Sequence, residues 1–581
     1  MNTMQLGPEE PGTDTKRLLI AVVASTLIFL VWQTFFFKPV VPKTTEAPSE
    51  TSAVQATADV SAPEQPATPE VSADTVASTP KRMPEAVEKI SIDVSKAAGE
   101  SEDAAALKGG FLVTMTNQGA QMRGFELTGY TDPHQKVEEG QTPAAVDLVS
   151  GAYRGAQLVA LRDRSGDVRL GADDAYELVR KSEQELVYSR LTPAGVRITR
   201  TYRFDTDRFA FTHEVTLKNE SGAAKTSALD VVLVGAERPG ERDEGGMFAP
   251  GTDQLGATCR AGGEQELWLS QELDEPESLS GQVQYVGIDR HFFLAALMPE
   301  KGTVTQACRV EGWAEGPDGR DGRGVLVTIE QAEIKLAPGA EQTFSHRAYF
   351  GPKQLQSLQQ AGYGLDENIQ FGWFGVLSRP MLWVLVWLYE HLGNFGIAII
   401  LLTLLMKALT FPLTQKSYVS MQQMKTLAPE MKKLQEKYGH DRAAMGQKQM
   451  ELYKEKGISP LAGCFPVLVQ MPIWFALYRT LWNSVELYQQ PFYLGISDLS
   501  QPDALLAGFP LLPVLVGALM LVQTLMQPAP QEQPQMKYVM WGMPIMFTFF
   551  MLQMPSGLSL YMITNSLLTM AQQYYIKRQY A

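Results

Sequence analysis

Cysteine and histidine are scarce in this chain, whose 581 residues contain three cysteines and six histidines. So few cysteines exclude a disulfide framework and a cysteine-rich zinc site, and histidines that occur singly argue against a metal centre. The chain also lacks a glycine-rich nucleotide loop, a nucleophile–base motif and the internal repeat that many transporters carry. We therefore expect no catalytic residue, no bound metal and no cofactor.

Positive charge is scarce in the first part of the chain. Residues 366–581 contain 15 Lys and Arg against 12 Asp and Glu, whereas the whole chain carries a net charge of −14. Residues 1–365 must therefore carry −17. An acidic composition is unsuited to a phosphate backbone, so we expect no direct DNA binding.

Long apolar runs are present, and the first follows Lys16 and Arg17. Residues 18–37 contain no charge and end in aromatic residues, which favours an uncleaved transmembrane anchor over a signal peptide. The short segment 1–17 is then cytoplasmic. Residues 38–106 are rich in Pro, Ala, Ser, Thr and Glu, a composition that predicts a disordered linker.

Residues 107–352 alternate between apolar and polar residues with a period of two. The segments 196–204 and 209–217 both show this pattern and are separated by an Asp-Thr-Asp turn. Many such short strands predict an antiparallel β-sandwich. His213 shares a face with phenylalanines, so we interpret it as a core residue. Cys259 and Cys308 can pair if the domain is periplasmic, although their separation alone does not establish the bond.

Residues 353–392 predict a connector followed by an amphipathic helix in the membrane interface. Arg379 and Glu390 make this helix a poor membrane span. The next segment, 393–413, is an apolar span with one charge, Lys407, and we expect it to end at Pro412. A cation in such a span costs about 2.5–3.5 kcal/mol on insertion scales. Lys407 either extends toward the headgroups or lines a wet, protein-walled site, and we favour the second interpretation.

Residues 414–460 are polar, contain nine Lys and Arg, and predict a cytoplasmic helical hairpin. An apolar stripe recurs there at helical spacing: Met421, Met424, Leu427, Met431 and Leu434. Such a stripe is either ordinary packing or an adaptable surface for varied apolar clients. The basic faces, which include Lys432 and Lys433, are solvated, contact anionic lipid or bind the ribosome.

Four more apolar runs predict four more spans, for six in total: 461–483, 508–527, 538–554 and 556–576. The excess of Lys and Arg around the hairpin, the loop 528–537 and the tail 577–581 places these parts in the cytoplasm. The sandwich and the loop 484–507 are then periplasmic. Polar residues on the spans, among them Thr403, Gln470 and Asn565, either join helices or line a water-accessible groove beside Lys407.

Four stretches together resemble a known family. They are YFGPK, FPLTQKSYVSMQQMKTLAPEMKKLQEKYG, PLAGCFPVLVQMPIWFALYRTL and MPIMFTFFMLQMPSGLSLYMITNSLLTMAQQ, and they are similar to the YidC/Oxa/Alb-type membrane protein insertases. The anchor and the large sandwich resemble the proteobacterial YidC form. This resemblance implies a hydrophilic groove with one cation, a sandwich like sugar-mutarotase folds, and the Sec translocon and the ribosome as partners.

The resemblance also suggests which residues form the substrate groove: Lys407, Thr403, Gln470, Met471, Tyr561 and Asn565. Two positions depart from the family pattern. Lys407 stands where arginine is usual, and Phe411 stands where tyrosine is common. Lysine keeps the charge but loses the bidentate geometry of a guanidinium, so a charge mechanism is retained and an arginine-specific contact is not implied.

These observations predict a multi-pass inner-membrane insertase and chaperone for nascent membrane proteins, acting alone or with the Sec translocon. Two alternatives remain at this point. A small-solute transporter would use Lys407 as an anion site, and a sugar-modifying enzyme would need a histidine and a carboxylate converging in a pocket of the sandwich.

Overall fold

The computed structural model describes residues 86–93, 109–132, 144–149, 159–171, 174–237, 255–315, 321–457, 465–493, 495–503, 509–526 and 534–580. The expected anchor at 18–37 lies outside these residues, as does most of the expected linker. Among the described residues, contacts separate the segment Leu427–Gly457 from the rest of the chain.

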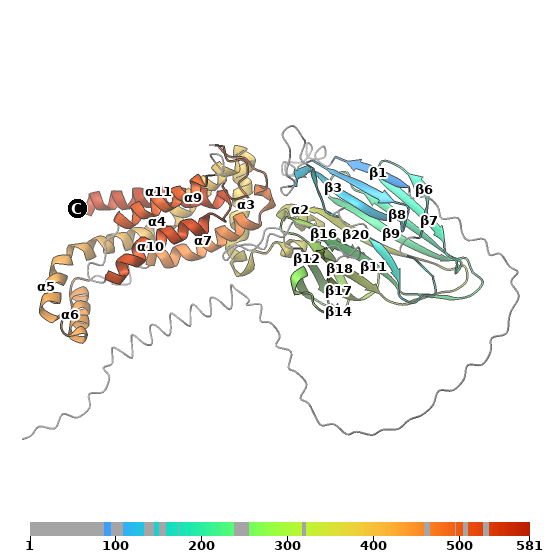
Figure 1. Cartoon of the computed structure of the whole chain (residues 1–581), viewed down its shortest axis with the longest axis horizontal. Coiled ribbons are helices and arrows are strands. Elements are labelled where there is room, and N and C mark those ends of the chain that lie inside the picture. Colours follow the sequence, from blue (N-terminus) through green and yellow to red (C-terminus); the bar gives the residue numbers. More distant parts are fainter. Residues whose placement is uncertain are drawn as a thin grey trace, which may run out of the picture. The chain divides into compact units, whose positions relative to one another are not determined.

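The larger unit begins with an antiparallel β-sheet domain (Figure 1). Its widest sheet has nine strands in the order β13, β12, β15, β16, β20, β9, β8, β7, β6. They span Glu264–Leu269, Gly256–Ala261, Val283–Asp289, Phe293–Pro299, Glu341–Pro352, Ala210–Asn219, Val196–Phe204, Glu185–Leu191 and Glu177–Lys181.

Three smaller sheets complete the domain. One has the order β14 (Glu277–Ser280), β17 (Thr305–Glu315), β18 (Asp321–Gln331), β11 (Leu229–Ala236) and β5 (Ala160–Asp163). The second has the order β1 (Val87–Ile92), β2 (Phe111–Thr116), β3 (Gln121–Thr131) and β4 (Ala145–Asp147), and the third pairs β10 (Lys225–Ser227) with β19 (Ile334–Leu336).

The smaller sheets pack on the inward face of the nine-stranded sheet. Phe125 of β3 meets Phe350 of β20 edge to face, with ring centroids 5.3 Å apart. Gln331 of β18 donates through Nε2 to His346 Nε2 of β20 at 3.2 Å. The expected alternation is present in β8 and β9, where every second residue is buried and the intervening ones are more exposed. This is the sandwich arrangement that a period of two favours.

The start of the β domain was predicted wrongly. Residues 87–92 fell within the expected linker, yet they form β1, which pairs antiparallel with β2. The segment VEKISI alternates, and its Ile90 and Ile92 are buried. Two isoleucines on one face give a short strand enough apolar surface to join a sheet, a signal that the overall polarity of the flanking sequence obscured.

A helical region follows the β domain. Its elements are α2 (Leu355–Ala361), the 3₁₀ turns η4 (Leu365–Asn368) and η5 (Gly372–Phe374), α3 (Gly375–Leu392), α4 (Phe395–Thr426), α7 (Phe465–Asn483), η7 (Val485–Leu487), α9 (Leu511–Met526), α10 (Pro534–Met551) and α11 (Ser556–Tyr580). Helix α4 contacts α3, α7 and α11, and α9 contacts α10 and α11. Figure 1 shows α4, α9 and α11 running alongside one another.

The helix that carries Lys407 does not end at Pro412 as expected, because α4 continues through Pro412 to Thr426. A proline removes one backbone donor from a helix. The carbonyl that loses its usual donor is Ala408 O, and the packing of α4 against α3, α7 and α11 keeps the helix continuous across this point. Helix α4 ends instead at Thr426. Leu427 separates it from α5 (Ala428–Tyr438), which carries Pro429 in its first turn.

That break also divides the expected apolar stripe. Met421 and Met424 lie on α4, whereas Met431 and Leu434 lie on α5, so the stripe does not follow one continuous helix. A proline in the first turn is favourable for a new helix and unfavourable for the continuation of an old one. Pro429 was therefore the sequence signal for the boundary.

The apolar helices of the structure differ in length. Among the described residues, one helical segment, Phe395–Met424, is long and apolar enough to cross a bilayer. Leu511–Met526 and Trp541–Met551 are shorter apolar helices. Helices α7 and α11 carry polar side chains, among them Gln470 of α7 and Asn565 of α11, which lower their mean hydropathy.

Candidate functional site

Lys407 lies in the middle of α4, on the side that meets α11. It is the only charged residue in the first half of the helix, among Ile, Leu and Ala. Its side chain is half-buried, while Leu404, Leu405 and Leu409 are more than two-fifths exposed. The helix thus directs apolar side chains outward and its one ammonium group toward another helix.

The partners of Lys407 are neutral oxygen atoms of α11. Nζ donates to the Thr569 hydroxyl at 2.7 Å and to Asn565 Oδ1 at 3.5 Å. Among the described residues, no carboxylate forms an ion pair with Lys407. An ammonium has three donors, and neutral acceptors satisfy hydrogen bonding without neutralising the charge. The site therefore holds a cation that is hydrogen-bonded but, among the described residues, not neutralised.

Further polar contacts join the same two helices. Gln572 of α11 donates through Nε2 to the Thr414 hydroxyl of α4 at 3.1 Å, and both side chains are buried. We call this row the polar seam and define it as Lys407, Thr414, Asn565, Thr569 and Gln572. Interhelical hydrogen bonds of this kind hold helices together where water is scarce.

The other predicted groove residues lie at different places. Gln470 of α7 donates to the Tyr561 hydroxyl of α11 at 2.7 Å, so these two side chains form a second bridge. Thr403 is buried, and its hydroxyl donates within its own helix to Ile399 O at 2.6 Å. Met471 is 44% exposed on α7. Among the described residues, no hydrogen bond joins any of these four to Lys407.

Sequence reasoning missed Gln572 and gave Thr569 no role as a partner of Lys407. Asn565, Thr569 and Gln572 recur at intervals of four and three, so they occupy one face of α11. That spacing was available in the sequence as a row of polar side chains along α11.

The two parts of the chain match two family models. The description "YidC periplasmic domain" applies to residues 109–384, and "60Kd inner membrane protein" applies to residues 387–581. The membrane protein insertase YidC of Geobacter metallireducens is 32% identical over 578 residues, which cover 97% of this chain and 99% of that one. The corresponding protein of Pelobacter propionicus is 31% identical with the same coverage.

The chain belongs to the YidC family of membrane protein insertases.

A solved YidC insertase, described as an active form with its first transmembrane domain resolved, is 18% identical and covers 80% of this chain and 90% of its own, at a TM-score of 0.34. A galactose mutarotase-like protein of Lactobacillus casei is 12% identical and covers 45% of this chain, at a TM-score of 0.30. At these scores the family assignment rests on the sequence relatives. As a YidC insertase, the chain is a non-enzymatic inner-membrane protein with a periplasmic domain.

The hairpin of this YidC insertase is the separate unit. Helices α5 and α6 (Arg442–Glu455) contact each other, and Lys456 pairs with Glu430 at 3.5 Å. Asp441 caps α6 by accepting from the amides of Ala443 and Ala444. The other predicted hairpin residues divide by exposure: Met424 and Met431 are half-buried, whereas Lys432 and Lys433 are exposed.

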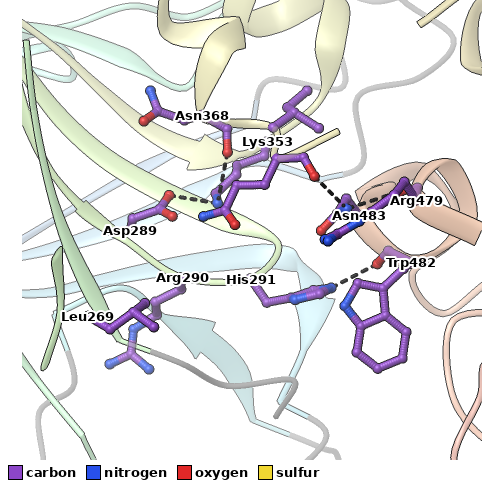
Figure 2. A pocket seen from close by; sticks show the side chains of 11 residues that line it. Leu269, Asp289, Arg290, His291, Lys353, Asn368, Arg479, Trp482 and Asn483 are labelled. Atoms are coloured by element: carbon purple, nitrogen blue, oxygen red, sulfur yellow. Dashed lines mark hydrogen bonds and ion pairs between the residues drawn. The ribbon is translucent and has the colours of Figure 1, made fainter. Parts of the chain in front are cut away.

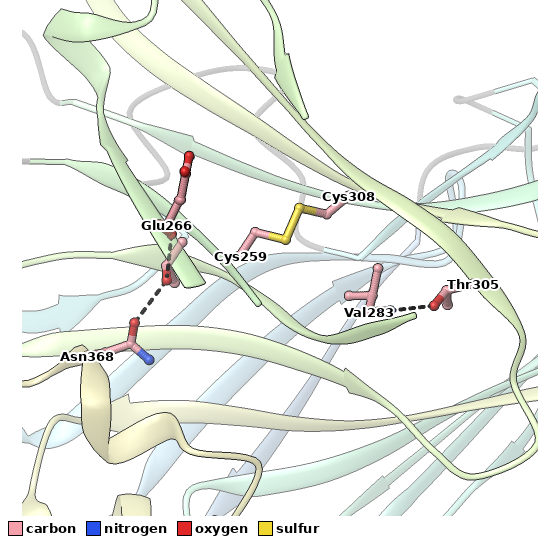
Figure 3. Close-up of a disulfide and its surroundings, with 7 residues drawn as sticks. Cys259, Glu266, Val283, Thr305, Cys308 and Asn368 are labelled. Atoms are coloured by element: carbon pink, nitrogen blue, oxygen red, sulfur yellow. Dashed lines mark hydrogen bonds between the residues drawn. A yellow bond between two sulfur atoms is a disulfide. The ribbon is translucent and has the colours of Figure 1, made fainter. Parts of the chain in front are cut away.

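In the YidC periplasmic domain, Cys259 of β12 and Cys308 of β17 form a disulfide (Figure 3). Both residues are fully buried, and their Cα atoms are 6.6 Å apart. The bond joins the nine-stranded sheet to the five-stranded sheet. Its place between the two layers gives it a structural role in the sandwich.

His213 lies in the core of the YidC sandwich rather than in an open site. It is fully buried, and its Nε2 accepts a hydrogen bond from Arg200 Nε at 3.3 Å. Burial lowers the pKa of His213 well below its usual value and lowers that of His346, its cross-strand neighbour, to about 4. No carboxylate bonds to either ring among the described residues, so the convergent pair that an enzyme in the sandwich would need is not formed there.

Proposed function

We propose that this insertase receives nascent membrane proteins along the polar seam and that Lys407 is its working charge. The observation that supports this is the set of contacts around Lys407: an ammonium in a membrane-spanning helix, held by Thr569 and Asn565, with no carboxylate partner among the described residues. If Lys407 had only a structural role, an apolar residue in its place or a carboxylate beside it would cost less free energy. An unpaired one remains available to an acidic side chain of a client.

The proposed mechanism uses two forces in sequence. Lys407 attracts an acidic residue in the short segment of the client that must cross the membrane, because charges interact more strongly at low dielectric. The apolar segment of the client then leaves sideways into lipid, driven by the hydrophobic effect. Leu404, Leu405 and Leu409, all exposed beside the seam, give that segment an apolar surface along which to leave. The mechanism requires no nucleotide.

We further propose six membrane spans, with 18–37 as the first and both termini in the cytoplasm. The distribution of Lys and Arg supports this topology. It places the seam within the bilayer, the sandwich in the periplasm and the hairpin in the cytoplasm. We propose that the groove is also lined by Thr403, Gln470, Met471 and Tyr561. The hydrogen bond between Gln470 and Tyr561 holds two of these side chains in place.

The hairpin is proposed to meet clients and the ribosome, and the Sec translocon is proposed as a second partner. Lys432 and Lys433 are exposed on α5 and are suited to a polyanionic surface. Met424 and Met431 are half-buried, and methionine side chains suit flexible apolar contacts with varied segments. Met421 is proposed to act with them on the basis of the sequence alone.

The proposal is tested by changing Lys407 and the client charge together. Lys407→Arg should insert acidic clients nearly as well as the wild type, because it keeps the charge. Lys407→Ala should slow clients with an acidic translocated segment several-fold and spare matched clients with a neutral one. Lys407→Glu should be worst for acidic clients through like-charge repulsion, and a basic residue in the client should partly restore insertion.

The measurement is insertion efficiency of matched clients at equal levels of folded insertase. Lys416→Ala provides a control, since it removes a lysine from the same helix outside the seam. An equal response of all clients to the Ala, Arg and Glu variants would exclude charge attraction and leave the apolar surface alone to carry insertion.

A further inference from the structure

A small polar cavity lies where the sandwich meets the end of α7 (Figure 2). Its volume is about 70 Å³, and its walls include Asp289, Lys353, Gln370, Arg479 and Asn483. Figure 2 shows the side chains of Arg479, Trp482 and Asn483 entering from α7, opposite Lys353 and Asp289 of the sandwich. The cavity is thus built jointly by the periplasmic domain and the membrane-inserted region.

The sandwich contributes a buried cation to this cavity. Lys353 is 4% exposed, and its Nζ lies 2.6 Å from Asp289 Oδ1 and donates to Asn368 O at 3.4 Å. An ammonium has three donors, so one N–H of Lys353 has no partner among the described residues. Asp289 is already neutralised by this ion pair. The sandwich side therefore offers a free donor without an excess of negative charge.

Helix α7 contributes a second cation. Arg479 lies four residues before the end of α7 and is half-buried, and no carboxylate pairs with it among the described residues. Both N–H groups of the neighbouring Asn483 side chain are engaged, since Nδ2 donates to Gln370 O at 3.1 Å and to Arg479 O at 3.0 Å. The guanidinium is therefore the free group on this side, and guanidinium groups favour bidentate contacts with oxyanions.

The volume of the cavity limits which ligands can fit. About 10–15 Å³ of such volume is enough to hold one water, so the cavity has room for several waters or for one compact tetrahedral oxyanion. The unpaired charge of Arg479 and the free N–H of Lys353 match the charge and the geometry of a phosphate group.

We propose that this cavity binds the phosphate of an anionic phospholipid from the periplasmic leaflet. The choice of a lipid over free phosphate rests on the proposed topology, which places the end of α7 at the outer headgroups. Trp482 at the cavity and Trp373, Trp383 and Trp387 of the adjoining segment are the aromatic residues typical of that level. A bound headgroup would join the sandwich to the membrane-inserted region through Lys353 and Arg479.

The test uses the full-length protein in detergent, titrated with phosphatidylglycerol, with phosphatidylcholine or with inorganic phosphate. Binding is followed by native mass spectrometry, and hydrogen exchange at residues 368–370 and 479–483 locates it. Phosphatidylglycerol should bind and protect these residues, and Arg479→Gln should weaken that binding at least tenfold. Arg479→Lys should retain part of it, because the charge is kept.

Arg180→Gln is the matched control, because it removes an arginine from an exposed ion pair of β6. It should bind phosphatidylglycerol like the wild type. A different outcome is that inorganic phosphate is the only one of the two ligands that protects the same residues, in a way that depends on Arg479. In that case the cavity binds phosphate, and the proposal that the phosphate comes from a lipid is wrong. Equal binding and equal protection in the wild type, Arg479→Gln and Arg180→Gln would overturn the site. None of these results depends on insertion activity, so they are independent of the role of Lys407.

Discussion

The side-chain amide of Gln489 forms a closed pair of hydrogen bonds with the backbone of Thr131. Oε1 accepts from Thr131 N at 3.1 Å, and Nε2 donates to Thr131 O at 2.6 Å. Thr131 ends β3 of the sandwich, and Gln489 follows α7 and η7, so the pair joins two regions that are 358 residues apart in sequence. Gln489 has a positive φ of 55°, a conformation that a non-glycine residue keeps only where its surroundings determine it.

Gln489→Asn should loosen this junction. Asparagine tolerates positive φ better than most residues and keeps the amide, but it is one methylene shorter and cannot make both bonds. Loss of two hydrogen bonds should cost about 1–3 kcal/mol. Hydrogen exchange at the end of β3 should therefore quicken. Gln342→Asn, which shortens an exposed glutamine of β20, should change nothing at Thr131. Unchanged protection in Gln489→Asn would show that the neighbouring aromatic contacts hold the junction alone.

The same junction should depend on pH through Glu486. One carboxyl oxygen accepts from Leu355 N at 3.3 Å, and the other has no hydrogen-bond partner among the described residues. Burial raises the pKa of Glu486 to about 7. The titratable groups that face it are Tyr130 of β3 and Tyr349 of β20, and its charge raises the pKa of both.

Because its pKa is raised in the docked state, Glu486 binds a proton more tightly there than in water. Docking is therefore favoured as pH falls from 8 toward 5 and is weakened as pH rises through 7, when the buried carboxylate ionises. Exchange of the amides 355–358, corrected for intrinsic rates, should increase between pH 6 and pH 8. Glu486→Gln should abolish this dependence, whereas Glu341→Gln, at an exposed residue of β20, should retain it. A dependence that survives Glu486→Gln would assign it to another group.

The close crossing of α9 and α10 predicts a stability effect at one glycine. A Cβ at Gly517 would collide with Oγ1 of Thr548, whereas a Cβ at Gly542 would meet no atom within 4 Å. Gly517→Ala should therefore separate the helices at a cost of about 1–3 kcal/mol, and Gly542→Ala should be neutral or slightly stabilising. Thermal unfolding of the two variants in the same detergent compares them directly. Equal midpoints would mean that Thr548 rotates away at no cost.

The disulfide predicts a redox-dependent stability of the sandwich. Cys259 and Cys308 are 49 residues apart, and closing a loop of this length stabilises a fold by about 2–4 kcal/mol. The double variant Cys259→Ala with Cys308→Ala should unfold at a lower temperature than the oxidised wild type. Reduction should lower the midpoint of the wild type toward that of the double variant, and it should leave the double variant unchanged. Free thiols in the oxidised wild type, found by mass spectrometry, would exclude the bond.

Sequence patterns predicted some parts of this molecule well because the relevant physics is local. The alternation in 196–204 coincides with β8, and the period of the apolar residues placed His213 in the core. These two inferences required only periodicity. Asn565 was expected beside Lys407 because it is a polar residue on a span and because of the family resemblance, and the two side chains are joined by a hydrogen bond at 3.5 Å.

Other features depended on contacts that no local pattern encodes. The helix was expected to end at Pro412, whereas α4 continues to Thr426, because its packing against α3, α7 and α11 outweighs the loss of one backbone donor. The pairing of Gln489 with Thr131 joins residues that are distant in sequence, so it follows only from the three-dimensional arrangement. The cavity beside Lys353 is similar, because its walls come from strands, a connector and a helix.

Thr569 provides the sharpest test of how Lys407 is held. The Thr569 hydroxyl accepts from Lys407 Nζ at 2.7 Å and donates to Asn565 O at 2.7 Å, within its own helix. Thr564 donates to Leu560 O at 2.8 Å in the same way but has no contact with Lys407. Thr569→Val and Thr564→Val therefore remove the same intrahelical bond, and only the first removes a ligand of the ammonium. Hydrogen bonds to charged groups contribute about 1.5–3 kcal/mol, so the difference between the two variants should be measurable.

Thr569→Val should make Lys407 react several-fold faster with an amine-directed reagent and should slow insertion of acidic clients while sparing neutral ones. Thr569→Ser, which keeps the hydroxyl, and Thr564→Val should both match the wild type. These expectations follow if α11 fixes the ammonium where a client carboxylate meets it. If Thr569→Val and Thr564→Val give equal labelling and equal insertion, the contact contributes nothing to holding the charge. Lys407 would then act as a mobile cation, and α11 would serve only to pack against α4.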